Sequence, residues 1–161
     1  MIRQATTADA AAIAAIYNHY VLNTTVTFEE QTVTTEQMAE RIEQVQNDAL
    51  PWLVLERSGD LLGYAYATKW RVRSAYRFSV ESTVYVKDAV TTKGIGSQLY
   101  QQLLAELKAL GLHLVIGGIT LPNDKSVALH EKFGFEKCGH FHQVGFKFEQ
   151  WRDVGYWQKL L

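Results

Sequence analysis

Residues 84–97 read Val-Tyr-Val-Lys-Asp-Ala-Val-Thr-Thr-Lys-Gly-Ile-Gly-Ser. The first three residues are typical of a strand, and the apolar spacing after Gly94 and Gly96 is typical of a helix. Glycines at a helix start let a ligand approach the backbone, where the first N–H groups have no partner within the helix. The helix dipole favours negative charge there, so the segment predicts a pyrophosphate cradle, to which Lys93 adds a positive charge.

These residues alone also fit a tight turn that binds nothing, because Gly-x-Gly is common at helix starts. Two better-known phosphate patterns are missing from the segment. Lys-Ser/Thr does not follow the second glycine, as it does in a Walker A loop, and the third glycine of the dinucleotide fingerprint is absent. ATP and nicotinamide cofactors are therefore poor candidates.

Outward from this segment, the expected elements follow the order β-α-α-β-β-β-α-β-α-β-β. Thr7 and Asp9 offer N-cap oxygens to a first helix, and Thr34 with Gln37 forms the capping-box pattern of a second. The expected strands are 2–5, 52–57, 61–70, 78–86, 113–120, 135–144 and 151–161, and the later helices are expected at 95–110 and 123–133. Strands outnumber helices and come partly as a hairpin, which indicates a mixed α/β sheet flanked by helices.

Composition narrows the class of protein. The chain has 161 residues, 47% hydrophobic and 20% charged, which indicates one folded domain over residues 1–161. Its net charge of −1 argues against nucleic acid or an anionic membrane as a partner. No apolar run reaches the roughly 18 residues of a membrane span, and the N-terminus lacks a secretory-signal pattern. The single cysteine, Cys138, excludes an internal disulfide and a cysteine-rich metal site, so a reducing compartment, the cytoplasm, is expected.

A second segment carries a resemblance to a known family. Residues 123–135 read Asn-Asp-Lys-Ser-Val-Ala-Leu-His-Glu-Lys-Phe-Gly-Phe. With the Gly-x-Gly loop, they resemble the GNAT superfamily of acetyl-coenzyme A-dependent N-acetyltransferases, and within it the phosphinothricin N-acetyltransferase group. Further matching segments are Asn18-His19-Tyr20, Pro51-Trp52-Leu53-Val54, ESTVYV at 81–86, LPND at 121–124 with Ser126-Val127, and 145–158. The resemblance implies the GNAT fold, an α/β (α+β) arrangement with a mixed, mostly antiparallel twisted sheet of about six or seven strands and about four helices.

Glu81 is the expected general base. A primary amine is mostly ammonium at neutral pH and must lose a proton before it can attack a thioester. Glu81 is a lone carboxylate in the strand expected at 78–86, where burial would raise its pKa, although a glutamate facing solvent would show the same pattern. The resemblance implies the catalytic role. It also implies a role for His130, as proton donor to the departing thiolate or as helper in deprotonating the amine. A surface histidine on an amphipathic helix is the other interpretation of His130.

The resemblance implies acetyl-coenzyme A as co-substrate. Val84, Tyr85 and Val86 would lie along its pantetheine arm, where a backbone N–H would polarise the thioester carbonyl. The other implied contacts are Thr92, Lys93, Gly94, Ile95, Gly96, Ser97 and Asn123. Two positions depart from the family pattern. Thr91 stands where the loop usually carries Gln or Arg, which weakens side-chain support for the cofactor, and Thr120 replaces an expected glycine near the acceptor pocket.

Basic residues after the third expected strand suggest an anionic acceptor. The segment 69–77 holds one lysine and three arginines, which a solvated loop would also explain. A protein-lysine acetyltransferase would be expected to show acidic groups instead. We expect Arg73 and Tyr76 to bind the carboxylate and the phosphinate or sulfone of a small amino acid, with Phe28 and Tyr85 as pocket walls. Phosphinothricin, methionine sulfoximine and methionine sulfone are the expected acceptors.

Other functions stay open from the sequence. Another small amine or a protein N-terminus is an alternative acceptor, and a non-catalytic acyl-coenzyme A sensor is an alternative class, which the presence of both Glu81 and His130 disfavours. A homodimer is implied by the resemblance alone, and no metal site is predicted. We interpret 151–157 as core or dimer contact, Cys138 as a buried strand cysteine, and the other histidines as structural.

Overall fold

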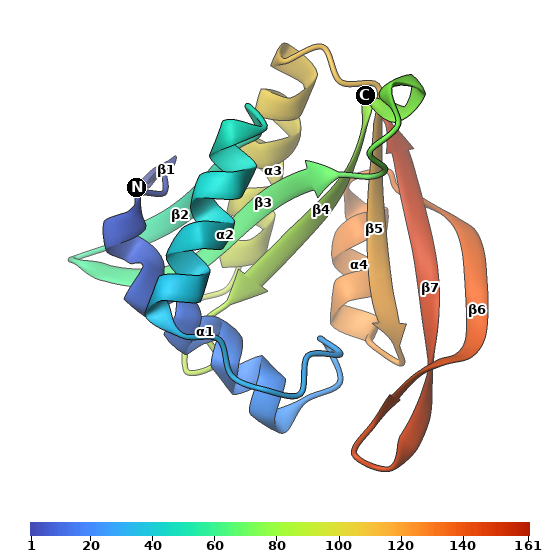
Figure 1. The fold of residues 1–161 in the computed structure, drawn as a ribbon, viewed down its shortest axis with the longest axis horizontal. Coiled ribbons are helices and arrows are strands. Elements are labelled where there is room, and N and C mark those ends of the chain that lie inside the picture. Colours follow the sequence, from blue (N-terminus) through green and yellow to red (C-terminus); the bar gives the residue numbers. More distant parts are fainter.

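A seven-stranded mixed sheet forms the centre of the molecule (Figure 1). The computed structural model describes residues 1–161, and its strands lie in the order β1-β2-β3-β4-β5-β7-β6. The strands are β1 (Ile2–Gln4), β2 (Trp52–Arg57), β3 (Asp60–Lys69), β4 (Ser79–Val86), β5 (Leu114–Leu121), β6 (Glu136–Lys147) and β7 (Gln150–Leu160). The α-helices are α1 (Ala10–Asn23), α2 (Thr35–Asn47), α3 (Ile95–Ala109) and α4 (Asp124–Lys132). The mixed, mostly antiparallel architecture expected from the sequence is confirmed, since β4–β5 is the one parallel pair.

Different helices cover the two faces of the sheet. α1 and α2 pack against each other in front of β2 and β3, and α3 lies behind them (Figure 1). α2 begins where the capping box predicts, because Thr34 Oγ1 accepts the Gln37 N–H at 3.1 Å and Gln37 Oε1 accepts the Thr34 N–H at 3.0 Å. Met38, Ile42 and Val45 repeat at helical spacing and are buried against the sheet. None of the four helices has the length and apolar composition needed to cross a membrane.

β4 and β5 diverge after a short parallel contact. Ser79, Val80 and Glu81 pair with residues 114–116, and beyond this point the two strands no longer pair with each other. β4 continues to Val86 against β3, and β5 continues to Leu121 against β7. Figure 1 shows the resulting wedge between them, with α4 beside β5. The facing edges of both strands therefore carry backbone groups that the sheet does not use.

β6 and β7 form a long antiparallel hairpin at one edge of the sheet (Figure 1). Near its tip, the Lys147 ammonium donates to the Thr27 carbonyl oxygen at 2.8 Å, and the ring of Phe28 packs on Gly145. The hairpin thus contacts the loop between α1 and α2, although the two are far apart in the sequence. Together they enclose the wedge from the side opposite α4.

The outer strand β6 overturns one expectation. Cys138 is exposed, so its interpretation as a buried strand cysteine is wrong. β6 is the last strand of the sheet, and no further strand covers its outer edge. On β7, Trp157 is buried in the core whereas 61% of Trp151 is exposed, so the segment 151–157 supplies both core and surface.

Candidate active site

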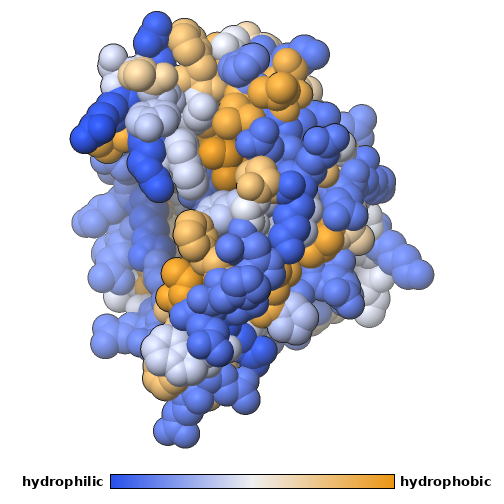
Figure 2. Space-filling model, turned by 90° about the vertical axis from the view of Figure 1, so that its right-hand side faces the viewer, coloured by the Kyte–Doolittle hydropathy of each residue, from blue (hydrophilic) through white to orange (hydrophobic).

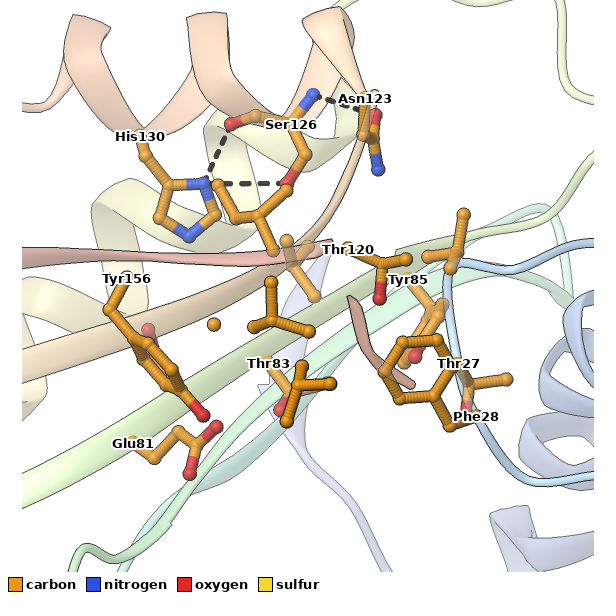
Figure 3. Close-up of a pocket in the computed structure, with 17 residues that line it drawn as sticks. Thr27, Phe28, Glu81, Thr83, Tyr85, Thr120, Asn123, Ser126, His130 and Tyr156 are labelled. Carbon is orange, nitrogen blue, oxygen red and sulfur yellow. Dashed lines mark hydrogen bonds between the residues drawn. The ribbon is translucent and has the colours of Figure 1, made fainter. Parts of the chain in front are cut away.

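A cavity of about 370 Å³ occupies the wedge between β4 and β5 (Figure 3). Its walls come from 81–85 on β4, 118–120 on β5, the first turns of α4, the α1–α2 loop and the β6–β7 hairpin. Glu81 is the one carboxylate among the lining residues, and no lysine or arginine lines the cavity. Glu81 is therefore the only carboxylate in the cavity that could accept a proton, and the other lining groups are the His130 imidazole and hydroxyl, amide and apolar groups.

Glu81 lies at the point where β4 and β5 separate. Its side chain projects into the cavity, and Figure 3 shows the Tyr156 hydroxyl pointing toward its carboxylate. Partial burial raises the pKa of Glu81, in the direction expected from the sequence, and the positive charge of Arg71 opposes this shift. A carboxylate with a raised pKa is better matched to accepting a proton near neutral pH than an ordinary exposed glutamate.

Two consecutive glycines on β5 make room for the polar side chains of the site. A Cβ at Gly118 would lie 3.3 Å from Glu81 Oε1 and 3.2 Å from a Tyr156 ring carbon. A Cβ at Gly117 would lie 2.5 Å from His130 Nε2, which no side chain could tolerate. The Gly117–Gly118 pair thus lets Glu81 approach β5 from one side and His130 from the other.

His130 reaches the cavity from α4, and its two ring nitrogens are engaged. Nδ1 lies 2.7 Å from the Ser126 carbonyl oxygen, an acceptor only, so Nδ1 carries a proton and donates it (Figure 3). Nε2 lies 2.9 Å from the Tyr100 hydroxyl, which in turn is hydrogen-bonded to Ser82 Oγ. Burial lowers the pKa of His130, so the ring is neutral at pH 7 and accepts the Tyr100 proton at Nε2.

The start of α3 has the features that its glycines predict. Gly94 is the N-cap residue and has φ +87°, a left-handed conformation that glycine adopts without strain. The Gln98 N–H bonds to the Gly94 carbonyl oxygen, whereas the N–H groups of Ile95, Gly96 and Ser97 have no acceptor within the helix. The loop before α3 is exposed, so packing does not seal this end of the helix.

A groove begins at this end of the helix, and the side chains that line it carry a net positive charge. Three lysines and one aspartate line it together with the loop 90–96. The Lys132 ammonium lies beside it and donates to Ser97 Oγ at 3.1 Å. A Cβ at Gly96 would lie 3.6 Å from both Val86 and Leu129, so the glycine keeps a passage open between the end of β4 and α4. The groove suits an anion held by backbone amides.

The groove and the cavity are lined by neighbouring residues in the second half of β4. Val86 lines the groove, and Val84 and Tyr85 line the cavity. The Tyr20 hydroxyl donates to the Val86 carbonyl oxygen and thereby fixes the end of the strand against α1. Asn123 lies across from these residues as the N-cap of α4, where its Oδ1 accepts the Ser126 N–H at 3.2 Å.

The opposite wall comes from the loop between α1 and α2. Phe28 and Tyr85 both line the cavity, and Thr27 lies beside them (Figure 3). Asn18 holds this loop in place, because its Nδ2 donates to the Val33 carbonyl oxygen at 2.9 Å and its Oδ1 accepts the Val33 N–H at 2.8 Å. The first residue of the Asn18-His19-Tyr20 segment therefore positions the loop, and the third positions β4.

Arg73 and Tyr76 do not line the cavity. Both lie in the exposed segment that joins β3 to β4, and 43% of Tyr76 is accessible. Arg71 in the same segment is the basic residue whose charge reaches Glu81. Its guanidinium stacks on Trp70, which in turn contacts Tyr156 edge to face. Within one chain, the structure therefore brings Phe28, Tyr85, Glu81 and His130 together, and it leaves Arg73 and Tyr76 outside.

Several lining residues were not singled out from the sequence. The sequence predicts Tyr156 as part of a core or dimer contact. Strand alternation indicates the face of the sheet on which a side chain lies, but not which groups pack against that face. Tyr100 hydrogen-bonds His130, and Ser82 hydrogen-bonds Tyr100; no sequence pattern indicates this chain of contacts, because only the fold brings the two residues to α4. Thr120, noted for replacing a glycine, does line the cavity.

Comparisons with known proteins identify the family of this chain. Residues 2–155 match the family model described as an acetyltransferase (GNAT) domain. The chain is 44% identical over 158 residues to a phosphinothricin N-acetyltransferase of Streptomyces viridochromogenes, covering 98% of this chain and 86% of that protein. It is 39% identical to an L-methionine sulfoximine/L-methionine sulfone acetyltransferase of Salmonella typhimurium, covering 99% of this chain and 94% of the relative.

A solved structure gives the same result. The crystal structure of a GNAT superfamily phosphinothricin acetyltransferase from Sinorhizobium meliloti, in complex with acetyl-coenzyme A, superposes with a TM-score of 0.96. Its sequence is 37% identical, and the match covers 100% of this chain and 88% of the other. This chain belongs to the GNAT acetyltransferase family, as the resemblance of its motifs predicted.

Proposed function

We propose that this protein transfers the acetyl group of acetyl-coenzyme A to the α-amine of a small amino acid, with phosphinothricin, methionine sulfoximine and methionine sulfone as candidate acceptors. The names of the two relatives support this class of acceptor. The observation that carries the proposal is the placement of two hollows next to each other along β4, a groove at the start of α3 and a cavity that contains Glu81.

The residues present fit acetyl-coenzyme A as co-substrate. Unpaired amides at Ile95, Gly96 and Ser97 would hold the diphosphate, with Lys93 and the other lysines of the groove adding positive charge. The passage that Gly96 leaves open would admit the pantetheine arm toward 84–86, where the β5-facing side of β4 has free backbone groups. Thr92 and Asn123 border the same path. Bound there, the co-substrate supplies an activated acetyl group at the cavity.

Glu81 would supply the base. The ammonium group of the acceptor loses a proton to the Glu81 carboxylate, directly or through one water molecule, and its nitrogen gains a free electron pair. That nitrogen then attacks the thioester carbonyl carbon. As the carbon–sulfur bond breaks, coenzyme A leaves as the thiolate, the nitrogen loses its second proton to form the amide, and a proton passes to the thiolate sulfur to give the free thiol. Backbone N–H groups of β4 would hold the negative charge that develops on the carbonyl oxygen.

His130 would act mainly through position. A neutral ring that donates Nδ1–H to Ser126 and accepts at Nε2 has no free proton to give. The ring fixes the first turns of α4 against β4 through Tyr100 and Ser82. Its assignment as the proton donor to the departing thiolate remains a prediction, and it would require the ring to exchange its proton with Tyr100.

The acceptor would be recognised mostly by neutral groups. The cavity has hydroxyl groups on Thr27, Thr83 and Thr120 and a phenol on Tyr156, but no cationic side chain. Hydroxyl and backbone donors can bind a carboxylate or a sulfone oxygen. Arg73, predicted with Tyr76 to bind the anionic end, would need the β3–β4 segment to fold toward the cavity when the acceptor enters.

We also propose that the protein is a homodimer, in a reducing cytoplasmic setting that suits its single exposed thiol. Large apolar side chains on the β6–β7 hairpin are more than half exposed, namely Phe141, Val144, Phe146, Phe148 and Trp151. Figure 2 shows this side of the molecule, with hydrophobic surface scattered among polar groups. A second copy of the chain would cover such a surface. Light scattering should give twice the chain mass, and a double charge substitution, Phe146→Glu with Trp151→Glu, should give the monomer.

A substrate panel tests the proposed activity. Purified protein is incubated with acetyl-coenzyme A and each of the three candidate acceptors, and release of the coenzyme A thiol is followed continuously. We expect saturable turnover with at least one acceptor, and acetylation of its α-amine by mass spectrometry. Amino acids whose α-amine is already methylated twice serve as controls, because their nitrogen has no second proton to lose and so cannot form a neutral amide.

Other outcomes of the panel would replace the proposal. Turnover with short peptides but with none of the amino acids would make a protein N-terminus the acceptor, and turnover with other small amines alone would change the substrate class. Binding of acetyl-coenzyme A without turnover on any amine would favour a sensor.

A further inference from the structure

A bulge in β6 gathers three side chains that can bind a metal, two histidines and one aspartate, at one point of the hairpin. Phe141 pairs with Val154 and Gly145 pairs with Arg152, so residues 142–144 stand opposite the single residue Asp153. Gln143 inside the bulge has φ +53°, which is unusual for a residue other than glycine. Bulges of this kind redirect side chains, and they are retained where that direction matters.

Asp153 accepts hydrogen bonds from both flanking histidines. His140 Nε2 lies 2.8 Å from Asp153 Oδ2, and His142 Nδ1 lies 3.2 Å from the same oxygen. The other oxygen, Oδ1, accepts the backbone N–H of Gln143 at 2.8 Å, so the carboxylate is oriented by the bulge itself. The three candidate ligand atoms all lie within 4.8 Å of one another.

These distances are close to those of a metal site. Ligands about 2.0–2.1 Å from a tetrahedral zinc ion are about 3.3 Å from each other, so a small outward movement of the Asp153 oxygen and the two imidazoles would admit the ion. Two imidazoles and one carboxylate are a common donor set for divalent transition metals, with one position left for water. Metal-binding carboxylates are commonly oriented by a hydrogen bond to the oxygen that does not bind the ion, and the Gln143 N–H supplies such a bond to Asp153 Oδ1.

We propose that His140 Nε2, His142 Nδ1 and Asp153 Oδ2 form a binding site for a divalent transition-metal ion, Zn²⁺ in the first place. The site lies on the face of β7 opposite the cavity, because Val154 and Tyr156 line the cavity and side chains alternate along a strand. A bound ion would join β6 to β7 across the bulge and stabilise the hairpin. The site is independent of the proposed acetyl transfer.

A hydrogen-bonded ion pair is the competing explanation, and two features disfavour it. One imidazole would satisfy Asp153 Oδ2, yet two rings lie side by side against it, with centroids 4.4 Å apart. The side chain of His142 is 80% exposed, so a hydrogen bond there would add little stability. A metal ion at this point would be bound by both imidazole rings, which explains why the two rings lie together.

The positive charge of Lys137 disfavours binding of a metal ion at His140. Its ammonium lies 2.8 Å from His140 Nδ1, which places the His140 proton on Nε2. Metal binding at Nε2 would move that proton to Nδ1 and release the lysine, whose side chain is exposed and already lies 5.3 Å from the Trp157 ring. Removal of the lysine charge should therefore strengthen metal binding, an outcome that a purely structural ion pair does not predict.

Titration of tag-free protein with Zn²⁺ and with Co²⁺ tests the site. We expect one Zn²⁺ bound per chain by calorimetry, a visible absorption band with Co²⁺, and a rise in the thermal unfolding temperature with Zn²⁺. His142→Ala should weaken binding at least about tenfold and Asp153→Asn similarly, whereas Lys137→Gln should tighten it. His113→Ala is the matched control, because His113 is exposed and distant from the bulge, and it should bind as wild type does.

Two results would overturn the proposal. The first is wild-type protein that binds no Zn²⁺. The second is Zn²⁺ binding that His142→Ala leaves unchanged. Because His142 is so exposed, this variant should fold normally, and equal far-ultraviolet circular dichroism of the two proteins would show that it does. Asp153→Asn could lose Zn²⁺ binding merely because it disturbs the bulge. The Zn²⁺ affinity of His142→Ala therefore decides whether the site exists.

Discussion

Gly96→Ala should move stability and cofactor affinity in opposite directions. The new methyl group would lie 3.6 Å from Leu129 and from Val86, which is ordinary van der Waals contact, so the folded chain accommodates it without strain. Gly96 is the second residue of α3, where alanine restricts the unfolded chain more than glycine does. The unfolding free energy should therefore rise by about 0.4–1 kcal/mol, and the unfolding temperature by about 1–4 °C.

The same methyl group should weaken binding of the co-substrate. It would project into the passage between β4 and α4 and keep a diphosphate from the amides of the first helical turn. Loss of one charge-assisted hydrogen bond costs about 1.5–3 kcal/mol, which corresponds to about 10- to 150-fold weaker binding of acetyl-coenzyme A. The KM of the amino acid should change much less, because Gly96 does not line the acceptor cavity.

Scanning fluorimetry of the free protein and calorimetric titration with coenzyme A measure the two effects. Gly139→Ala is the control, since a Cβ there meets only Tyr156 Cβ at 4.0 Å, far from α3. It should bind coenzyme A as wild type does. If Gly96→Ala binds coenzyme A as tightly as wild type, the amides at the start of α3 do not hold the diphosphate, and the reasoning from the glycine loop fails.

Three more variants test other parts of the site. Arg71→Gln removes the charge that lowers the pKa of Glu81, so the acidic limb of kcat/KM against pH should move to higher pH, and a limb that stays in place would contradict this coupling. Burial lowers the pKa of His130 from its ordinary 6.5, so the unfolded chain binds more protons as pH falls through 6.5 and below. Stability should fall in that range, and His130→Gln should show a flatter dependence in urea titrations at successive pH values. Asn18→Ala releases the loop that carries Phe28, and it should raise the acceptor KM severalfold without changing the acetyl-coenzyme A KM; equal effects on both would argue against a loop-specific role.

Local physics explains why much of the fold could be predicted. The capping box at Thr34, the glycine at Gly94 and the alternation in β4 each act over a few residues, and each element starts where these signals lie. Glu81 can be singled out for the same reason, because it is the lone carboxylate in a strand rich in β-branched and aromatic residues, whereas its predicted role as base rests on the motif resemblance. The motif resemblance then supplied the arrangement of the elements, which no local signal contains.

The rest of the site depends on contacts between distant segments. The basic residues of 69–77 show that the loop is positively charged, but not which way it folds. Arg73 and Tyr76 were therefore predicted to bind the acceptor, although neither lines the cavity. Tyr100 meets His130 across 30 positions of sequence. The bulge opposite Asp153 is equally hidden, because it exists only in the pairing of β6 with β7.

In the proposed mechanism, Glu81 in the wedge between β4 and β5 removes the proton that blocks the amine. Glu81→Gln keeps the shape of the side chain and removes its basicity. With the best acceptor from the panel, we predict a kcat lower by about 10²- to 10⁴-fold and an unchanged affinity for coenzyme A, while Glu136→Gln on the exposed end of β6 should behave as wild type. A Glu81→Gln enzyme that turns over at the wild-type rate would contradict the account.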